Sequence, residues 1–293
     1  MSAIYLATAP VSWGVMEETG NAHWPTWRQV LDEIARLDFQ GTELGPYGFY
    51  PTDALQLRDE LAQRNLTLTS AFVPIGLFEA PRQEADIKIA RDAARLLKAL
   101  QCPYIVLADA MRPPGAPDPD MDAWRSAARL METLAREFRD EMGLDTVFHL
   151  EAGSRLETPA DMDLLADLTD PALIGICLDT GHHAYSDGDP RDAIARHGNR
   201  IRYFHLKDLN PAVAHRVKVG GLDFHTAVID GIFPAIGEGS VDIAGVIEDI
   251  KSLGYEGWIV VEQDTLGTHD YAGRTPLEAV GVSRKYLEDT LGL

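Results

Sequence analysis

Four polar residues of this sequence each stand at the end of a short apolar run. The run Thr-Val-Phe-His-Leu ends in Glu151, Ile-Gly-Ile-Cys-Leu in Asp179, Ile-Arg-Tyr-Phe in His205 and Trp-Ile-Val-Val in Glu262. Carboxylates and imidazoles are the ligand types that bind divalent metal ions in proteins. If the fold brings these four side chains together, they form a metal site suited to chemistry on a small oxygenated molecule.

The apolar runs themselves have the composition of buried parallel strands. They are short, rich in β-branched and aromatic residues, and separated by stretches with helical spacing. In parallel α/β proteins the ligand site forms at the carboxyl ends of the strands, which is where the four polar residues stand. Glu262 is the strongest single indication, because a lone carboxylate ending so apolar a run would be costly without a cationic partner.

The chain contains about eight strand-like runs, the number that a closed barrel requires. Its 293 residues suit one barrel of about 250 residues better than two α/β domains. We therefore predict an α/β fold, a single (β/α)8 TIM barrel spanning residues 1–293. An open doubly wound sheet is the alternative, but no Gly-x-Gly-x-x-Gly loop follows the first strand. The predicted strands begin near Ile4, Phe39, Leu66, Tyr104, Thr146, Ile174, Ile201 and Gly257, and the predicted helices cover 27–37, 54–64, 84–100, 123–141, 159–168, 189–197, 241–253 and 276–291.

A long connection, residues 209–240, follows the seventh predicted strand. Connections of this length inside a compact domain are usually functional lids or disordered segments. The segment contains Phe224, Ile229, Ile232 and Phe233, which favours an ordered, lid-like insertion.

Composition excludes several classes of function. The net charge of -20 disfavours binding to nucleic acid and to anionic membranes. No apolar stretch approaches the roughly 18 residues of a membrane span, and no signal peptide is visible, so we expect a cytoplasmic protein. Cys102 and Cys177 lie in or beside apolar runs and are expected to be buried, reduced thiols.

Further polar residues stand near the same strand ends. His149 shares a strand face with Glu151, and the turn Asp-Thr-Gly-His brings His182 back over the rim. Lys207 follows His205 and supplies a cation. Two more candidates carry alternatives: Glu43, which either contacts substrate hydroxyls or closes a loop, and Trp13, which either covers the pocket or packs in the core.

The sequence resembles the sugar phosphate isomerase/epimerase superfamily, the xylose-isomerase-like barrels, and within it the inosose (2-keto-myo-inositol) dehydratases. The resemblance covers nearly the whole chain. The segments that carry it are Ala9-Pro-Val-Ser-Trp-Gly14, Gly41-Thr-Glu-Leu-Gly-Pro-Tyr-Gly48, Asp179-Thr-Gly-His182, His205-Leu-Lys-Asp208, Gly257-Trp-Ile-Val-Val-Glu262 and the lid-like Gly231-Ile-Phe-Pro-Ala-Ile-Gly-Glu-Gly239.

The resemblance implies one divalent metal ion held by Glu151, Asp179, His205 and Glu262. Mn²⁺ is expected first, with Co²⁺, Mg²⁺ or Zn²⁺ as alternatives. The implied partner is a small polyol or keto-sugar, and barrels of this kind often pair, so a homodimer or homotetramer is expected. The residues expected to contact substrate are Trp13, Glu43, His149, His182 and Glu238.

The expected reaction is the dehydration of a keto-inositol through an enediolate. The metal polarises the ketone, a carboxylate or His182 removes the neighbouring proton, and Lys207 offers a second cation to the enediolate. Loss of a β-hydroxyl makes the enzyme a lyase, with His182 as the acid/base. Return of the proton instead makes it a keto-sugar isomerase or epimerase, with Glu151 and Glu262 as an opposed acid and base. Two other hypotheses are a phosphoesterase for abasic DNA, which needs more metal ligands and a basic groove, and a sugar-binding barrel without catalysis.

Overall fold

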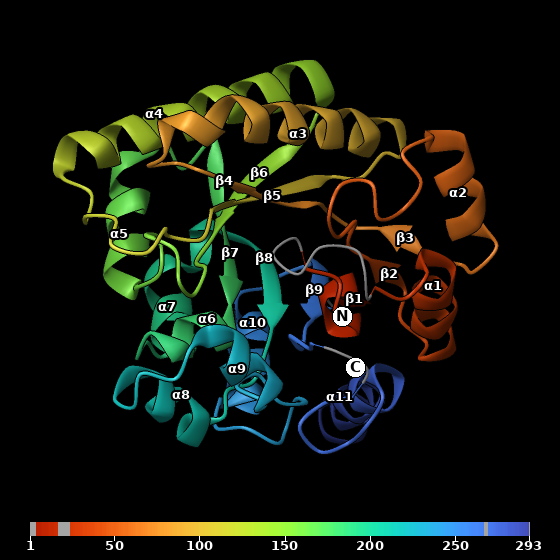
Figure 1. The fold of residues 1–293 in the computed structure, drawn as a ribbon. Coiled ribbons are helices and arrows are strands. Elements are labelled where there is room, and N and C mark those ends of the chain that lie inside the picture. The colour runs from red at the N-terminus through yellow and green to blue at the C-terminus, as the bar shows by residue number, and fades with distance from the viewer. Residues whose placement is uncertain (1–3, 17–23, 267–268, 293) are drawn as a thin grey trace.

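The computed structural model describes residues 4–16, 24–266 and 269–292. Within them, parallel strands form one sheet, and helices surround it on the outside (Figure 1). The strands are β1 (Ile4–Thr8), β2 (Gly41–Thr42), β3 (Thr67–Leu68), β4 (Phe72–Ile75), β5 (Tyr104–Asp109), β6 (Asp145–His149), β7 (Ile174–Asp179), β8 (Ile201–Leu206) and β9 (Gly257–Val261). Their order is β3-β2-β1-β9-β8-β7-β6-β5-β4, and the predicted TIM-barrel architecture is confirmed.

The third predicted strand is divided into β3 and β4, and this division closes the barrel. β3 pairs with β2, whereas β4 pairs with β5 at the other end of the strand order. Between them, the Ser70 carbonyl accepts the Leu44 N–H on one side and the Ala71 carbonyl accepts the Val106 N–H on the other. The segment therefore changes its pairing partner at residues 70 and 71. Because β3 and β4 together occupy one strand position, the nine labelled strands form an eight-stranded barrel.

The eight predicted helices are present, and three shorter ones join them among the described residues. Thr158 caps the helix that begins at Pro159: its side chain accepts the Asp161 N–H, and the Asp161 side chain accepts the Thr158 N–H. The predicted helices are α1 (Trp27–Arg36), α2 (Ala54–Ala62), α3 (Ala80–Ala99), α4 (Met121–Glu137), α5 (Pro159–Leu168), α7 (Pro190–His197), α10 (Ile243–Ser252) and α11 (Pro276–Leu291); the additional ones are α6 (Thr180–Tyr185), α8 (Pro211–Lys218) and α9 (Phe224–Ile229). None of the described helices is both long and apolar enough to cross a membrane.

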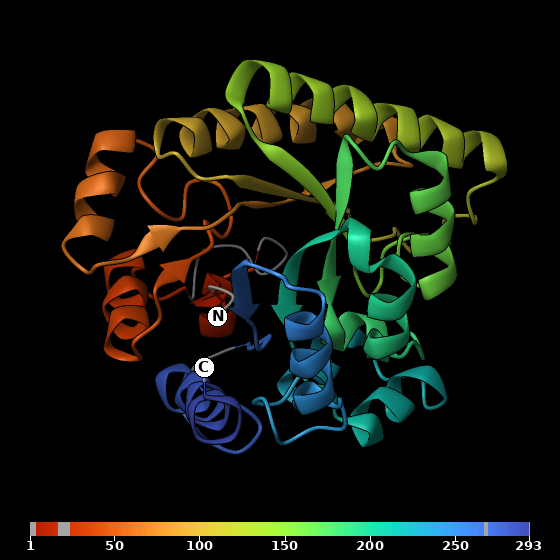
Figure 2. The same ribbon diagram turned by 180° about the vertical axis from the view of Figure 1, so that it is seen from behind.

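Two buried layers hold the barrel together. The larger one packs the outward faces of the strands against the helices, which ring the strands in both views (Figure 2). The smaller layer comes from the strands and residues next to them: it contains Val147, Cys177, Tyr203 and Val260 and lies inside the barrel. Cys177 is buried there, and Cys102 is buried as well; both are free thiols, as expected.

The inner layer fixes where the polar strand ends point. Side chains alternate between the two faces of a strand, so a residue two positions after an inward-facing one also faces inward. Asp179 follows Cys177, His205 follows Tyr203 and Glu262 follows Val260 by two positions. The strands therefore direct these three polar side chains into the barrel at its carboxyl end.

The segment 209–240 contains α8 and α9, and both its ends are tied to Asp208. The Asp208 carboxylate accepts the N–H groups of Leu209 and Val241 through Oδ1 and those of Gly237 and Gly239 through Oδ2. Phe233 from this segment lies against the site: its ring centroid is 4.9 Å from that of His182 and 5.0 Å from Lys207 Nζ. Through Phe233 the insertion thus contacts His182 and Lys207 of the site. Its role as a lid stays a prediction.

Candidate metal centre

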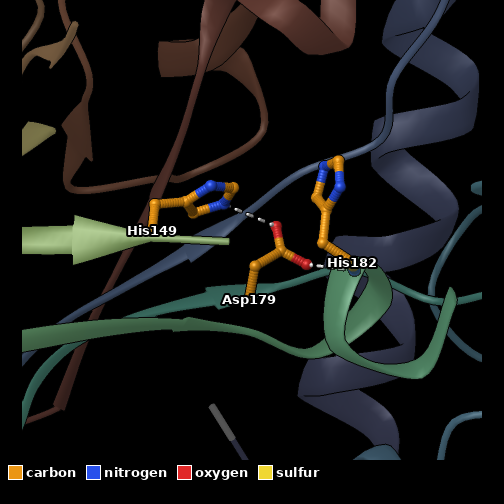
Figure 3. Close-up of side chains that lie close together, drawn as sticks. All are labelled: His149, Asp179 and His182. Atoms are coloured by element: carbon orange, nitrogen blue, oxygen red, sulfur yellow. Dashed lines mark hydrogen bonds and ion pairs between the residues drawn. The ribbon is translucent and has the colours of Figure 1, made fainter. Parts of the chain in front are cut away.

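Side chains from three neighbouring elements meet at the carboxyl end of the barrel. His149 ends β6, Asp179 ends β7 and His182 lies in the first turn of α6 (Figure 3). The His149 ring points at the Asp179 carboxylate, with Nε2 3.5 Å from Oδ2. The second oxygen, Oδ1, accepts the His182 N–H at 2.8 Å and so caps the helix. Asp179 therefore uses one oxygen for the fold and leaves the other facing the site.

Three histidines and three carboxylates form two neighbouring groups of candidate ligands. His205 Nδ1 lies 3.8 Å from Asp179 Oδ2 and 3.3 Å from Glu262 Oε2. Ligand atoms of His149, Asp179 and His182 lie within 4.8 Å of one another, as do those of Glu43, His205 and Glu262. Separations of this size suit a divalent ion with ligands at about 2.0–2.2 Å.

The hydrogen bonding indicates that a cation fits here. The buried polar atoms without a hydrogen-bond partner include Asp179 Oδ2, His205 Nδ1 and both ring nitrogens of His149. Unsatisfied buried polar groups are rare in folded proteins and require an explanation, such as an ion. Because three of these atoms border the same point, a bound divalent cation would satisfy them together.

Glu151 lies on the rim of this cluster. Its Oε2 is 3.5 Å from His149 Nδ1 and its Oε1 is 3.8 Å from His182 Nε2. Its side chain is 21% exposed, whereas that of Asp179 is 0% exposed. Glu151 thus stands between the buried ligand atoms and the mouth of the site.

Lys207 lies among the carboxylates and balances part of their charge. Its Nζ is 2.8 Å from Asp264 Oδ1, 3.2 Å from Glu262 Oε2 and 3.4 Å from Asp179 Oδ2. Burial alone would lower the pKa of Lys207, but the carboxylates of Asp179, Asp264 and Glu262 raise it well above its usual value. Burial opposes ionisation of Glu262 as well, yet His205 and Lys207 lower the pKa of Glu262 to about 2. The cluster therefore contains ionised groups at neutral pH.

His182 is fixed in one tautomer by a backbone group. The Ala152 N–H donates to His182 Nδ1 at 3.0 Å, so the neutral ring carries its hydrogen on Nε2. Burial, and then the charge of Lys207, lower the pKa of His182 well below its usual value, which keeps the ring neutral. His182 Nε2 lies 3.0 Å from Lys207 Nζ. Two hydrogen-bond donors thus lie side by side, and an oxygen within hydrogen-bond distance of both would accept from both.

Gly181 allows Lys207 to lie close to α6. A Cβ added at Gly181 would be 2.6 Å from Lys207 Cγ and 2.8 Å from Lys207 Cβ. Replacing Gly181 by alanine is expected to displace Lys207 and to cost about 1–3 kcal/mol of unfolding free energy, the usual effect of overpacking. Urea unfolding measures the cost, and a crystal structure of the variant measures the displacement. Gly281→Ala is the matched control, since its added Cβ would meet only Leu37 at 3.4 Å; equal stability of the two variants would contradict the expectation.

The site opens into a cavity whose walls come from several strand ends. The predicted site residues that line it are Glu43, His149, Glu151, His182, His205, Lys207 and Glu262. Sequence reasoning missed Asp109 and Asp264, which also line it. Burial raises the pKa of each of these two carboxyl groups to about 6. The remaining wall residues are Ala9, Val11, Val15, Met16, Gly45, Pro46, Phe72, Pro74 and Met111.

Two residues predicted to contact substrate are not among those that line this cavity. Trp13 is 2% exposed, and its Nε1 donates to Glu33 Oε2 at 2.6 Å, so it packs in the core. Glu238 lies outside the cavity, where its carboxylate bonds to Arg274 and to the Tyr271 hydroxyl. Arg274 follows Glu238 by 36 residues in the chain. That long-range partner holds Glu238 outside the cavity in this structure, and its contact with substrate stays a prediction.

Comparison with known proteins agrees with this architecture. Residues 31–288 match the family described as xylose isomerase-like TIM barrel. The chain is 33% identical to an inosose dehydratase of Geobacillus kaustophilus, over 91% of this chain and 90% of that one. It is 31% identical to the rhizopine catabolism protein MocC of Rhizobium meliloti, over 90% and 82% of the two chains.

Solved structures share the fold at low sequence identity. A D-allulose 3-epimerase from Methylomonas sp. superposes with a TM-score of 0.72 at 16% identity, covering 99% of this chain and 98% of that one. The IOLI protein, crystallised with a zinc atom, superposes with a TM-score of 0.74 at 13% identity and 97% coverage of both chains. On the family match and the full-length relatives together, this chain belongs to the xylose isomerase-like TIM barrel family.

Proposed function

We propose that this protein is a metal-dependent lyase that dehydrates a keto-inositol, 2-keto-myo-inositol in the first instance. The observation that carries the proposal is the set of buried ligand atoms without a hydrogen-bond partner on His149, Asp179 and His205, next to the donor pair of Lys207 and His182. The full-length similarity to inosose dehydratases at about 30% identity supports the substrate class.

The proposed ligands of the divalent ion are Asp179, His205, Glu262 and Glu151. His149 is the alternative to Glu151, because its Nε2 is 3.5 Å from Asp179 Oδ2 while Glu151 lies at the rim. We expect Mn²⁺, with Co²⁺, Mg²⁺ or Zn²⁺ as alternatives. When bound, the ion would act as a Lewis acid on the substrate carbonyl.

The side chains supply the remaining functions. Lys207 Nζ and His182 Nε2 are donors 3.0 Å apart, so they would stabilise a substrate oxygen that lies within hydrogen-bond distance of both and on which negative charge develops. His182 cannot accept a proton at Nδ1 without losing the Ala152 bond, and the neutral ring could give up its Nε2 hydrogen only by becoming an imidazolate, so its role is that of a hydrogen-bond donor to the leaving hydroxyl, whose proton comes from a carboxyl group. The base that removes the proton is then a carboxylate. Asp264, 3.9 Å from His182 Nε2 and with a pKa near 6, and Glu151 are the candidates.

The second candidate function is a keto-sugar isomerase or epimerase with the same metal ion. Glu151 and Glu262 both line the cavity, so they could hold and return a proton on opposite sides of a substrate carbon. A dehydratase differs in needing a proton donor beside the leaving hydroxyl, and Asp264, which lies near the donor pair of Lys207 and His182 and has a pKa of about 6, favours the lyase.

The test is to mix the Mn²⁺-loaded protein with 2-keto-myo-inositol and follow the ultraviolet absorbance of an enolised dione. Glu262→Gln should lose this absorbance, because it removes a ligand charge at almost unchanged size. Glu248→Gln, the same substitution at an exposed position of α10, should keep it. Solvent deuterium incorporated into keto-sugars without dione formation would instead support the epimerase. Bound metal with neither signal would overturn both functions.

A further inference from the structure

Glu43 forms a buried hydrogen-bonded chain that ends at the metal centre. It stands just after β2, is 1% exposed and accepts the Ser70 hydroxyl at 2.6 Å through Oε1. The same oxygen lies 3.0 Å from His205 Nε2. A carboxylate buried this deeply needs partners that offset its desolvation, and these two contacts provide them.

The two nitrogens of His205 have different surroundings. Nε2 faces Glu43, whereas Nδ1 has no hydrogen-bond partner and lies 3.3 Å from Glu262 Oε2. Both neighbours are carboxylates, which can only accept, so Nε2 carries its hydrogen toward Glu43, and a cation bound near Glu262 would take the place of a second hydrogen on Nδ1. In metal proteins a carboxylate on the far nitrogen of a ligating histidine fixes the tautomer and orients the ring.

The divided third strand supplies the support for Glu43. Ser70 lies between β3 and β4, where the segment changes its pairing partner, and it is 0% exposed. Its neighbour Thr69 accepts the Tyr203 hydroxyl at 2.9 Å, and Tyr203 stands two residues before His205 on β8. Glu43, the Thr69-Ser70 break and β8 are thus linked by hydrogen bonds across the interior of the barrel.

We propose that Glu43 is a positioning residue that holds His205 with Nδ1 toward the metal ion, and that Ser70 holds Glu43. This inference rests on the proposed metal site and replaces substrate contact as the role of Glu43. A substrate-contacting Glu43 would alter the KM and leave the affinity for metal unchanged. A Glu43 that ligates the ion would have to use its second carboxylate oxygen, because Oε1 already accepts from both Ser70 and His205, and its replacement would then abolish binding of the ion instead of weakening it.

The experiment measures metal affinity and needs no turnover. Mn²⁺ binding to the metal-free protein is measured by competition with a fluorescent chelator for the parent, Glu43→Gln and Ser70→Ala. We expect one ion per chain in each, with the Kd raised about 10–100-fold in Glu43→Gln, the usual effect of losing such a partner. Ser70→Ala should raise it less, because the Glu43 charge remains. Glu60→Gln, the same substitution on α2 where Glu60 pairs with Arg64, should leave the Kd unchanged.

A second readout reports the tautomer directly. In the Zn²⁺-loaded protein, ¹⁵N chemical shifts should give His205 a hydrogen on Nε2 and a metal-bound Nδ1. An unchanged Kd in Glu43→Gln, complete loss of the ion, or coordination through Nε2 would each overturn the proposal. A parent protein that binds no ion would instead refute the proposed function, so the two failures can be told apart.

Discussion

Replacing Lys207 by methionine is expected to lower turnover of 2-keto-myo-inositol by about 10²–10³-fold, the usual effect of removing a donor to a developing oxyanion. It should also destabilise the metal-free protein by about 3–5 kcal/mol, because Asp179, Glu262 and Asp264 would lose their buried counter-charge. Mn²⁺ should bind at least tenfold more tightly, since the ammonium no longer repels it. Urea unfolding with and without Mn²⁺ measures the last two effects.

Lys218→Met is the matched control for this prediction. Lys218 forms an ion pair with Asp187, whose side chain is 87% exposed. Exposed pairs contribute about 0–1 kcal/mol, so the control should keep its stability and its affinity for Mn²⁺. Weaker Mn²⁺ binding in Lys207→Met would mean that the ammonium orders the ligands instead of competing with the ion, and would contradict the charge argument.

Strand alternation explains why much of the site could be predicted from the sequence. His149, Asp179, His205 and Glu262 each end or follow an apolar run, and the period of two fixes the face on which they stand. The same two-residue alternation places Lys207 on the face of His205 and Asp264 on the face of Glu262, each two positions further along the chain. Asp264 could have been found in this way, but it lies past the end of β9, where alternation no longer has to hold.

Other features depend on contacts between distant segments. Glu43 was recognised as a strand-end residue, yet its partner His205 lies 162 residues away and meets it only because the barrel closes. The helix α6 has six residues, too few for a periodic apolar pattern, and its position fixes His182. Glu238 also has a partner that local sequence does not indicate, since Arg274 lies 36 residues away and binds its carboxylate. Local sequence thus identifies the polar residues at the strand ends. The distant residues that contact and position them become known only from the folded barrel.

Asp179 has two proposed roles: its Oδ1 caps α6, and its Oδ2 faces the metal ion. Two substitutions separate these roles. Asp179→Asn keeps an Oδ1 that can accept the His182 N–H, because asparagine caps helices about as well as aspartate. Asp179→Ala removes the cap. Its unfolding free energy should be lower than that of the asparagine variant by about 1 kcal/mol, within a range of about 0.5–2 kcal/mol. Both remove the Oδ2 that faces His149 and His205, so both should weaken Mn²⁺ binding by more than the 10–100-fold typical of an outer-shell partner.

The two readouts are chemical unfolding of the metal-free variants and chelator competition for Mn²⁺. Equal stability of the asparagine and alanine variants would show that the cap contributes nothing to the fold. If Asp179→Asn binds Mn²⁺ as tightly as the parent protein, the ion is held elsewhere. That result would contradict the proposed metal site. If Asp179→Asn loses affinity for Mn²⁺ but keeps its unfolding free energy, the two oxygens of the Asp179 carboxylate act separately. Oδ1 then caps the helix, and Oδ2 faces the ion.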